Sequence, residues 1–231
     1  MKAAPRQFAL EFPHRPAYGR EDFLVTAANS EAVAFIDRWP GWNMPALWLY
    51  GPASSGKSHL AAVWAQKAAA PIISAEDLLK DTADNLSKRG AHLVVERADL
   101  IVGDREPETV LFHLYNLLKE EGRSLLLTAC ASPQHLQFVV PDLASRVRSC
   151  PSIAIQAPDD DLLGALMVKH FHDRQLSVPE EGIAYLLPRI ERSFDALQQL
   201  VSMVDKRALQ EKKPVTIPLL REVLIEISTQ G

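Results

Sequence analysis

Short apolar runs alternate with amphipathic stretches between residues 47 and 155 of this 231-residue chain. The runs have the length and continuous apolar character of buried strands, and they occupy residues 47–50, 71–74, 92–95, 125–130 and 153–155. The stretches between them place apolar residues at helical spacing, most clearly in 106–121, which is followed by Gly122. Strands that are almost wholly apolar and alternate with helices predict an α/β fold, with a parallel five-stranded sheet flanked by helices on both faces.

The two ends of the chain differ from this alternating region. Residues 1–20 contain three prolines and mixed charge, which favours an extended arm outside the core. Beyond Ala157 the pattern is helical only, and Pro158 followed by three aspartates is a strong helix start. The expected parts are an arm (1–20), an α/β domain (21–157) and a small all-helical domain (158–231).

Capping and stop signals place the individual helices. A helix is expected over 29–39, with Asn29 or Ser30 as its cap and Pro40 as its stop. Another helix should begin at 75–80, after the second strand. The remaining helices are expected at 141–148, 162–172, from 179 onward, 193–210 and 216–227.

The first strand leads into Gly51-Pro-Ala-Ser-Ser-Gly-Lys-Ser58, which fits the phosphate-binding motif G-x-x-x-x-G-K-[ST] at every position. Between a strand and a helix, such a loop turns backbone N–H groups toward phosphate oxygens, and the helix N-terminus adds partial positive charge. Lys57 would reach the β- and γ-phosphates, and the Ser58 hydroxyl would bind Mg²⁺. The expected nucleotide-binding residues are Gly51, Pro52, Ala53, Ser54, Ser55, Gly56, Lys57, Ser58 and the adjoining His59.

Composition narrows the environment in which the protein works. The formal net charge of −4 supplies no overall attraction to nucleic acid, so protein partners are favoured. Cys130 and Cys150 lack metal-ligand spacing, which predicts reduced, inert packing residues. The chain opens without a signal-peptide pattern, and its apolar runs are shorter than a membrane span. We therefore expect a cytoplasmic protein without membrane contact.

One segment of the arm has the spacing of a recognition peptide. In Gln-Phe-Ala-Leu-Glu-Phe, an extended chain would offer the amide of Gln7 and the apolar side chains of Leu10 and Phe12 to a groove in a partner. The alternative is a short edge strand on the protein's own domain. Spacing alone favours that edge strand.

Four further motifs follow one another in the order found in a known family. They are Gly56-Lys-Ser-His-Leu60, Phe112-His-Leu-Tyr-Asn-Leu-Leu118, Pro141-Asp-Leu-Ala-Ser-Arg146 and Thr216-Ile-Pro-Leu-Leu-Arg-Glu-Val-Leu224. Together they resemble the AAA+ ATPases of the DnaA replication-initiator family, and most closely its shorter Hda-type regulators. The resemblance covers nearly the whole chain beyond the arm and implies an AAA+ P-loop domain followed by a helical lid. DnaA continues into a DNA-binding domain that has no counterpart here, so DNA contact is expected only indirectly.

The same resemblance implies two interaction sites. Hda-type regulators carry an N-terminal peptide that binds the polymerase sliding clamp, and the segment with Gln7, Leu10 and Phe12 is similar to it. Arg146 matches the arginine finger that one AAA+ subunit inserts into the nucleotide site of its neighbour, where it can increase the rate by roughly 10³–10⁵. Without the resemblance, Arg146 would be expected as a surface residue paired with Asp142.

The end of the third strand departs from the residues that the family uses to hydrolyse ATP. Glu96 stands at the Mg²⁺ position, one methylene longer than the usual aspartate. Arg97 replaces the carboxylate that would orient water, and an arginine cannot act as a base because its guanidinium stays protonated. Asp99 is a possible substitute, although its place two residues further along need not direct it at the γ-phosphate.

Two more departures concern the recognition of phosphate. Cys130 occupies the polar sensor position of DnaA, and Asp195 in the lid stands where an arginine usually contacts phosphate, with Arg192 close by. A carboxylate at Asp195 would repel a third phosphate group. Because the phosphate-binding loop is kept, the sequence predicts that the protein binds nucleotide with Mg²⁺ and has little turnover. The departures favour ADP as the bound nucleotide, and ATP is the alternative.

Three functions remain open at this point. The first is a regulator that binds the clamp, holds ADP and presents Arg146 to ATP-bound DnaA, whose hydrolysis it completes. The second is an autonomous AAA+ ATPase, such as a remodeller or helicase loader, with Glu96 or Asp99 as base. The third is a non-catalytic adaptor between clamp and initiator. The sequence leaves the oligomeric state open, and a homodimer is one possibility.

Overall fold

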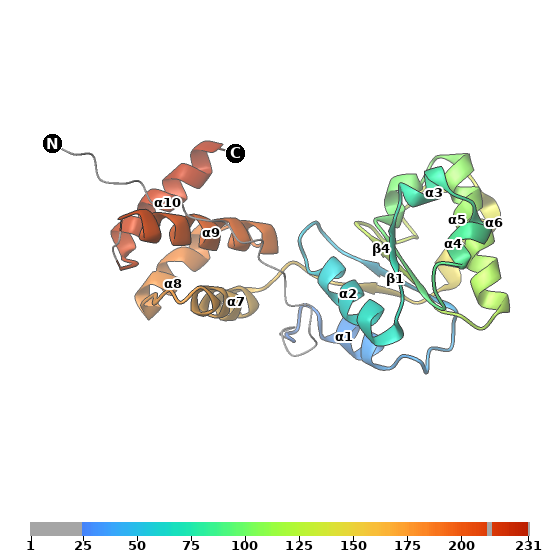
Figure 1. Cartoon of the computed structure of the whole chain (residues 1–231), viewed down its shortest axis with the longest axis horizontal. Helices are drawn as coiled ribbons and strands as arrows, with labels where there is room; N and C mark the ends of the chain where they lie inside the picture. Colours follow the sequence, from blue (N-terminus) through green and yellow to red (C-terminus); the bar gives the residue numbers. More distant parts are fainter. Residues whose placement is uncertain (1–24, 212–213, 231) are drawn as a thin grey trace. The chain divides into compact units, whose positions relative to one another are not determined.

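The computed structural model describes residues 25–211 and 214–230. Its contacts divide the chain into two compact units, and the boundary falls between Ala157 and Pro158. The first unit contains the β-sheet, and the second is helical (Figure 1). No helix within the described ranges combines the length and the apolar character that a membrane span requires.

The sheet has five parallel strands in the order β2-β3-β4-β1-β5. Their bounds are β1 Ala46–Tyr50, β2 Ile72–Ser74, β3 Leu93–Glu96, β4 Leu125–Ala129 and β5 Ser152–Ala154. Strand β1 lies between β4 and β5, with Trp48 in register with Leu127 on one side and Ser152 on the other. The loop after β1 therefore leaves an inner strand at the carboxyl edge of the sheet, where ligands of parallel sheets bind.

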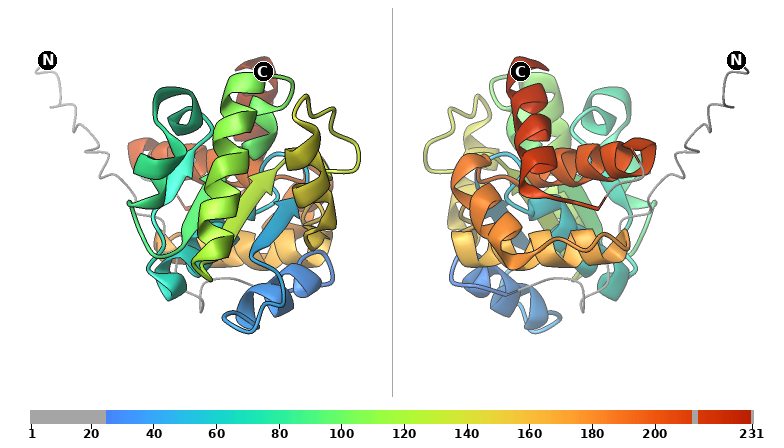
Figure 2. Two further views of the ribbon diagram at one scale, coloured as in Figure 1. Left: turned by 90° about the vertical axis from the view of Figure 1, so that its right-hand side faces the viewer. Right: turned by 90° about the vertical axis from the view of Figure 1, so that its left-hand side faces the viewer.

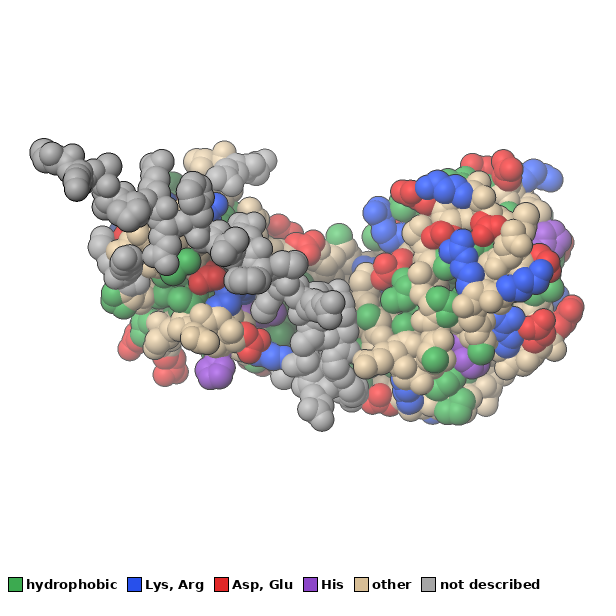
Figure 3. All heavy atoms as spheres, in the orientation of Figure 1, with side chains coloured by type: hydrophobic (Ala, Val, Ile, Leu, Met, Phe, Trp, Pro, Cys, Tyr) green, Lys and Arg blue, Asp and Glu red, His purple; other side chains and the backbone are tan. Residues whose placement is uncertain are grey.

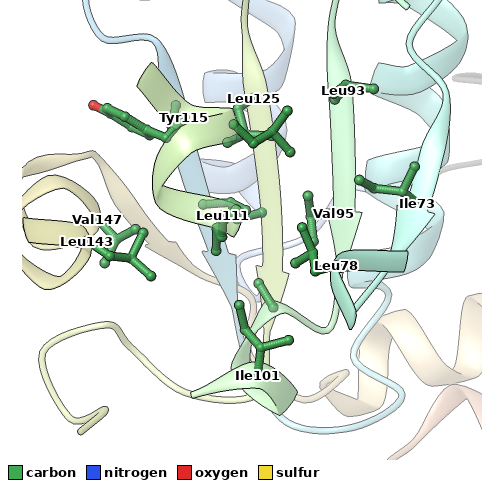
Figure 4. Close-up of a cluster of buried hydrophobic side chains, with 14 of the residues drawn as sticks. Ile73, Leu78, Leu93, Val95, Ile101, Leu111, Tyr115, Leu125, Leu143 and Val147 are labelled. Atoms are coloured by element: carbon green, nitrogen blue, oxygen red, sulfur yellow. The ribbon is translucent and has the colours of Figure 1, made fainter. Parts of the chain in front are cut away.

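Alternate strand residues pack on opposite faces, which explains why the strands are apolar throughout. On one face, Leu47 and Leu49 of β1 pack with helices α1 (Ser30–Asp37) and α2 (Lys57–Ala68). On the other face, Trp48 packs in the cluster of Figure 4, to which the remaining helices of this unit contribute. Those helices are α3 (Asp77–Lys80), α4 (Ala83–Ser87), α5 (Arg105–Glu120) and α6 (Pro141–Ser149). The predicted α/β fold with both faces covered is confirmed.

Two predicted helices differ in detail. The helix expected from 75–80 is two short helices, because Asp81 has an extended backbone and Thr82 is the N-cap residue of α4. The Oγ1 of Thr82 accepts a hydrogen bond from Asn85 N at 3.3 Å. Helix α1 ends at Asp37, before Pro40. Its cap position is Asn29, whose Oδ1 accepts from Thr26 N at 3.0 Å and so stabilises the turn before the helix.

The second unit contains four α-helices among its described residues and a 3₁₀ turn: α7 Asp160–Asp173, α8 Glu180–Leu186, η3 Leu187–Arg189, α9 Phe194–Glu211 and α10 Ile217–Gln230 (Figure 2, right). The predicted acidic helix start is present, since Asp159 Oδ1 accepts from Leu162 N at 2.8 Å. Helix α9 contacts both α7 and α10, and its buried residues include Leu200 and Val204. This unit has the all-helical character expected from the sequence.

Charged residues are mixed on the face of the α/β unit seen in Figure 3, where lysines and arginines lie among aspartates and glutamates. The exposed ion pairs of the described residues include the Lys88–Asp84 contact of 2.8 Å. This face therefore lacks a basic surface of the kind that binds nucleic acid.

Candidate nucleotide-binding site

The loop between β1 and α2 has the backbone that a phosphate-binding loop requires. Ser54 and Gly56 have left-handed conformations, with φ of +53° and +95°. Gly56 is also the N-cap residue of α2, so the loop runs directly into the positive end of a helix. A loop of alternating handedness followed by a helix N-terminus forms a concave surface of backbone amides suited to anions.

Gly51 is required for a different reason, which is the close approach of the backbone that follows β5. A Cβ atom on Gly51 would lie 2.1 Å from the carbonyl oxygen of Ile155. The neighbouring backbone is fixed by hydrogen bonds from Ile155 N to Tyr50 O at 2.7 Å and from Gly51 N to Ala129 O at 3.2 Å. Only glycine fits where the loop leaves the sheet.

Lys57 lies within the loop rather than in solvent. Its Nζ donates to the carbonyl oxygens of Gly51 at 2.9 Å and Pro52 at 2.5 Å, and only 9% of the residue is exposed. Burial lowers the pKa of the Lys57 ammonium, and the nearby side chains of Cys130 and Asp99 oppose this decrease. The ammonium is therefore held at the mouth of the loop, where phosphate oxygens would replace the two carbonyls.

The charged residues Arg97 and Asp99, which follow β3, have different surroundings. Arg97 is exposed, adopts φ of +54° and donates its backbone N–H to Thr128 Oγ1 at 3.0 Å. Its left-handed backbone turns the chain into the 3₁₀ helix η2 (Ala98–Ile101). Asp99 of η2 is thereby brought near Lys57, and its Oδ1 is buried without a hydrogen-bond partner. Whether Asp99 is directed at a γ-phosphate stays a prediction.

The position of Cys130 differs from the buried one that the sequence predicts. The sequence indicates two packing thiols, but only Cys150 is buried, where its sulfur lies 3.6 Å from the hydroxyl of Tyr115. Cys130 is exposed at the end of β4, close to Lys57. The reason is that β4 already ends at Ala129, so the chain leaves the sheet one residue earlier than the apolar run predicts. Both thiols are free.

The oxygen-bearing side chains suit Mg²⁺ bound together with phosphate. Ser58 is exposed at the start of α2, Glu96 is half-buried at the end of β3, and the buried Oδ1 of Asp99 has no partner. Among the described residues there is no group of three or more His, Cys, Asp and Glu side chains that could hold a metal alone. Mg²⁺ characteristically takes one or two protein oxygens and completes its shell with phosphate and water. These residues fit that pattern.

Arg146 lies on α6, whose inner face is formed by Leu143, Ala144 and Val147. The arginine is exposed, and its side chain forms no ion pair with any residue that the structure describes. The pairing with Asp142 that the isolated sequence favours is absent. A guanidinium on the outer face of a helix is available to a second molecule.

The other predicted site residues lie elsewhere in the chain. Asp195 is exposed in the first turn of α9, and Arg192 forms an ion pair with Asp160 at 3.0 Å, both within the helical unit. Their contribution to the nucleotide site stays a prediction. The clamp-binding residues Gln7, Leu10 and Phe12 lie outside the described residues.

The sequence analysis missed Glu108, which is completely buried on α5. The signal was present, because Glu108 lies on the same face of the helix as the buried Leu111 and Tyr115, at positions i, i+3 and i+7. A carboxylate in an apolar stripe indicates a fixed hydrogen-bonding role.

The fold of this chain is similar to those of solved DnaA and AAA domains. The chain is similar to domain III of the Thermotoga maritima replication initiation protein DnaA, with a TM-score of 0.81 over 93% of this chain and 98% of that one at 21% identity. For AMPPCP-bound DnaA from Aquifex aeolicus the TM-score is 0.73, over 85% and 67% of the two chains at 20% identity. The FIGL-1 AAA domain matches with a TM-score of 0.68, over 91% and 83% at 13% identity.

The helical unit has a more specific match than the fold of the chain does. Residues 159–224 match the family model described as Hda, lid domain. Together with the fold that this chain shares with DnaA domain III, this match makes the chain similar to Hda in its helical unit and to DnaA in its fold. The resemblance seen in the sequence motifs is confirmed.

Proposed function

We propose that this protein regulates the initiation of chromosome replication by completing the ATP-hydrolysing site of DnaA in trans with Arg146. The observation that carries the proposal is the exposed guanidinium of Arg146 on α6, which forms no ion pair with any described residue, in a chain with an Hda-like lid. A guanidinium is always charged and offers a planar set of donors to phosphate oxygens. Placed in the partner's site, it would stabilise the charge that develops on the transferring phosphoryl group.

The protein's own site holds nucleotide, and ADP is its resident form. A DnaA with this fold binds AMPPCP, and the present chain has the loop, the helix N-terminus and Lys57 to hold β-phosphate in the same way. Ser58 and Glu96 would hold Mg²⁺, which neutralises phosphate charge when bound. Arg97 leaves the position of a water-orienting carboxylate with an exposed cation. Binding without efficient turnover follows.

The arm would bring the regulator to DNA that is being replicated. Gln7, Leu10 and Phe12 would bind the sliding clamp as an extended peptide, so that DnaA is inactivated only after replication has begun. Contact with DNA is then indirect, through the clamp.

The arm is tested by replacing Gln7 and Phe12 with alanine together. We expect clamp affinity to fall by about 100-fold, because two anchor side chains are lost. The midpoint of thermal unfolding and the affinity for ADP should stay unchanged. Glu11→Ala is the matched control, because Glu11 lies within the segment but is not one of its three anchor residues. Clamp affinity retained in the double variant would refute the tether, and titration calorimetry measures it directly.

Asp99 favours a second candidate, an autonomous ATPase, because its buried Oδ1 has no hydrogen-bond partner among the described residues and the side chain lies near Lys57. Turnover by the isolated protein separates the two functions, with the bound nucleotide identified after denaturation. We expect negligible hydrolysis and release of ADP. Robust hydrolysis that is lost in Asp99→Asn or Glu96→Gln, but kept in the matched exposed variant Asp104→Asn, would replace the regulator with an ATPase in its own right.

A further inference from the structure

Glu108 is a buried carboxylate that the nucleotide site does not use. It is 0% exposed and lies near the start of α5. Its Oε1 accepts from Gly103 N at 2.8 Å and from Val139 N at 3.2 Å, and its Oε2 accepts from Val139 N at 2.9 Å and Val140 N at 2.7 Å. All its hydrogen-bond donors in the described chain are backbone amides, and no lysine or arginine there pairs with it.

The geometry specifies a carboxylate at this position. Burying a charged group is costly unless its lone pairs are satisfied, and here three amides from two loops satisfy both oxygens. A glutamine of the same size would place an NH₂ group against at least one N–H donor. The Glu108 carboxylate therefore links the two loops by accepting hydrogen bonds from both. An uncharged side chain of the same shape would lose the hydrogen bond to one of them.

One of those loops begins the helix that carries Arg146. Val140 is the N-cap residue of α6, which has no side-chain cap, and Pro141 follows it as the first helical residue. At the other end of α6, Arg148 donates to the carbonyl oxygens of Pro133 and Leu136, at 3.2 and 2.9 Å. The start of α6 is therefore held by Glu108, and its end is held by Arg148.

The body of α6 is held by apolar contacts, which permit small shifts that directed hydrogen bonds do not. Leu143 and Val147 point from α6 into the cluster that also contains Leu111 and Tyr115 of α5 (Figure 4). Such contacts exclude water and bring the two helices together, but they are not directional. The position of the first turn of α6 along α5 thus depends on the Glu108 hydrogen bonds.

We propose that Glu108 is a positioning residue for Arg146: by holding the amides of Val139 and Val140, it sets where α6 presents the guanidinium. The inference rests on the proposed function of Arg146 as a trans-acting finger. Gly103, the third donor, follows η2, so the same carboxylate also ties the segment containing Asp99 to the start of α6. A misplacement of about 1 Å in a catalytic group can reduce a rate by about 100-fold.

Stimulation of ATP hydrolysis by DnaA, with clamp-loaded DNA present, tests this role through Glu108→Gln and its matched control Glu106→Gln. Glu106 is exposed two residues earlier on the same helix. We expect Glu108→Gln to lower the maximal stimulated rate by 10- to 100-fold. The affinity of this variant for ADP, and the concentration of it that gives half-maximal stimulation of DnaA, should stay within about twofold of the wild-type values. The reason is that interactions made only in the transition state affect the maximal rate. Glu106→Gln should behave as wild type.

The maximal stimulated rate and the half-saturating concentration of the regulator together distinguish a misplaced Arg146 from partial unfolding of the variant. A partly unfolded protein would need a higher concentration to reach the same maximum, whereas a misplaced finger lowers the maximum itself. An unchanged maximum for Glu108→Gln overturns the inference. If Arg146→Ala also stimulates normally in this assay, the proposed function fails as well, which separates the two failures.

Amide hydrogen exchange gives a second test that does not depend on DnaA. In the wild type, Val139 and Val140 should be protected, and Glu108→Gln should accelerate their exchange by at least tenfold while β4 amides stay protected. If Glu108→Gln does not fold, Glu108→Asp replaces it, since it keeps the charge with a shorter reach and should reduce the maximum by a smaller factor. Unprotected Val139 and Val140 amides in the wild type would overturn the inference whatever the variants do.

Discussion

Replacing Arg146 with alanine should return the ATPase rate of DnaA to its unstimulated value, a loss of about 10³-fold or more at saturation. The guanidinium acts on the transferring phosphoryl group of the partner, so its loss removes charge stabilisation that exists only in the transition state. Arg146 is exposed and has no ion-pair partner in the part of the chain that the structure describes, so its replacement there leaves no buried group without a partner. The folded state, ADP affinity and clamp affinity of the variant should therefore match the wild type.

Two controls make this result specific to Arg146. Arg105→Ala removes an exposed arginine from α5 and should stimulate DnaA normally. Arg146→Lys keeps the charge but loses the planar set of donors, so it should recover little of the stimulation. Single-turnover hydrolysis of ATP by DnaA measures all three. Normal stimulation by Arg146→Ala would leave the adaptor function, in which the protein links clamp and initiator without contributing to hydrolysis.

Gly51→Ala should weaken nucleotide binding strongly and destabilise the α/β unit. The new Cβ would lie 2.1 Å from the carbonyl oxygen of Ile155, which is backbone and cannot rotate away. Either β1 or the chain after β5 must shift, and both are joined through the hydrogen bond from Ile155 N to Tyr50 O. We expect the free energy of unfolding to fall by about 3 kcal/mol, at the upper end of the cost of overpacking. ADP affinity should fall by at least about 100-fold, equivalent to about 2.7 kcal/mol.

Gly122→Ala is the matched control, because no atom lies within 4 Å of its added Cβ. Its φ of +66° makes alanine unfavourable by about 1 kcal/mol, yet it follows α5 away from the phosphate loop. The Gly122→Ala variant should therefore unfold at a slightly lower urea concentration than the wild type and bind ADP with wild-type affinity. Urea unfolding and ADP titration of both variants decide the point, and wild-type ADP affinity in Gly51→Ala would contradict the role assigned to this glycine.

The sequence by itself predicted the features that depend on short-range pattern. The apolar runs predicted the parallel sheet, and the motif ending in Lys57-Ser58 predicted the loop between β1 and α2. The change to a purely helical pattern after Ala157 predicted the second unit. Each of these follows from the period of apolar residues or from a contiguous motif, because those properties are set by neighbours in the chain.

The tertiary structure decided which distant side chains share a site. Asp99 reaches Lys57 because a left-handed residue, Arg97, turns the chain into η2, and the need for that turn is not visible in the local pattern. Cys130 is exposed because β4 ends before it. Glu108 accepts hydrogen bonds from the amides of Val139 and Val140, which are 31 and 32 residues away in the chain. These amides come within reach only when α5 and α6 have packed together. Hydrogen-bond partners of buried charges are set by the fold as a whole, whereas strands, helices and the phosphate loop are set by their own residues.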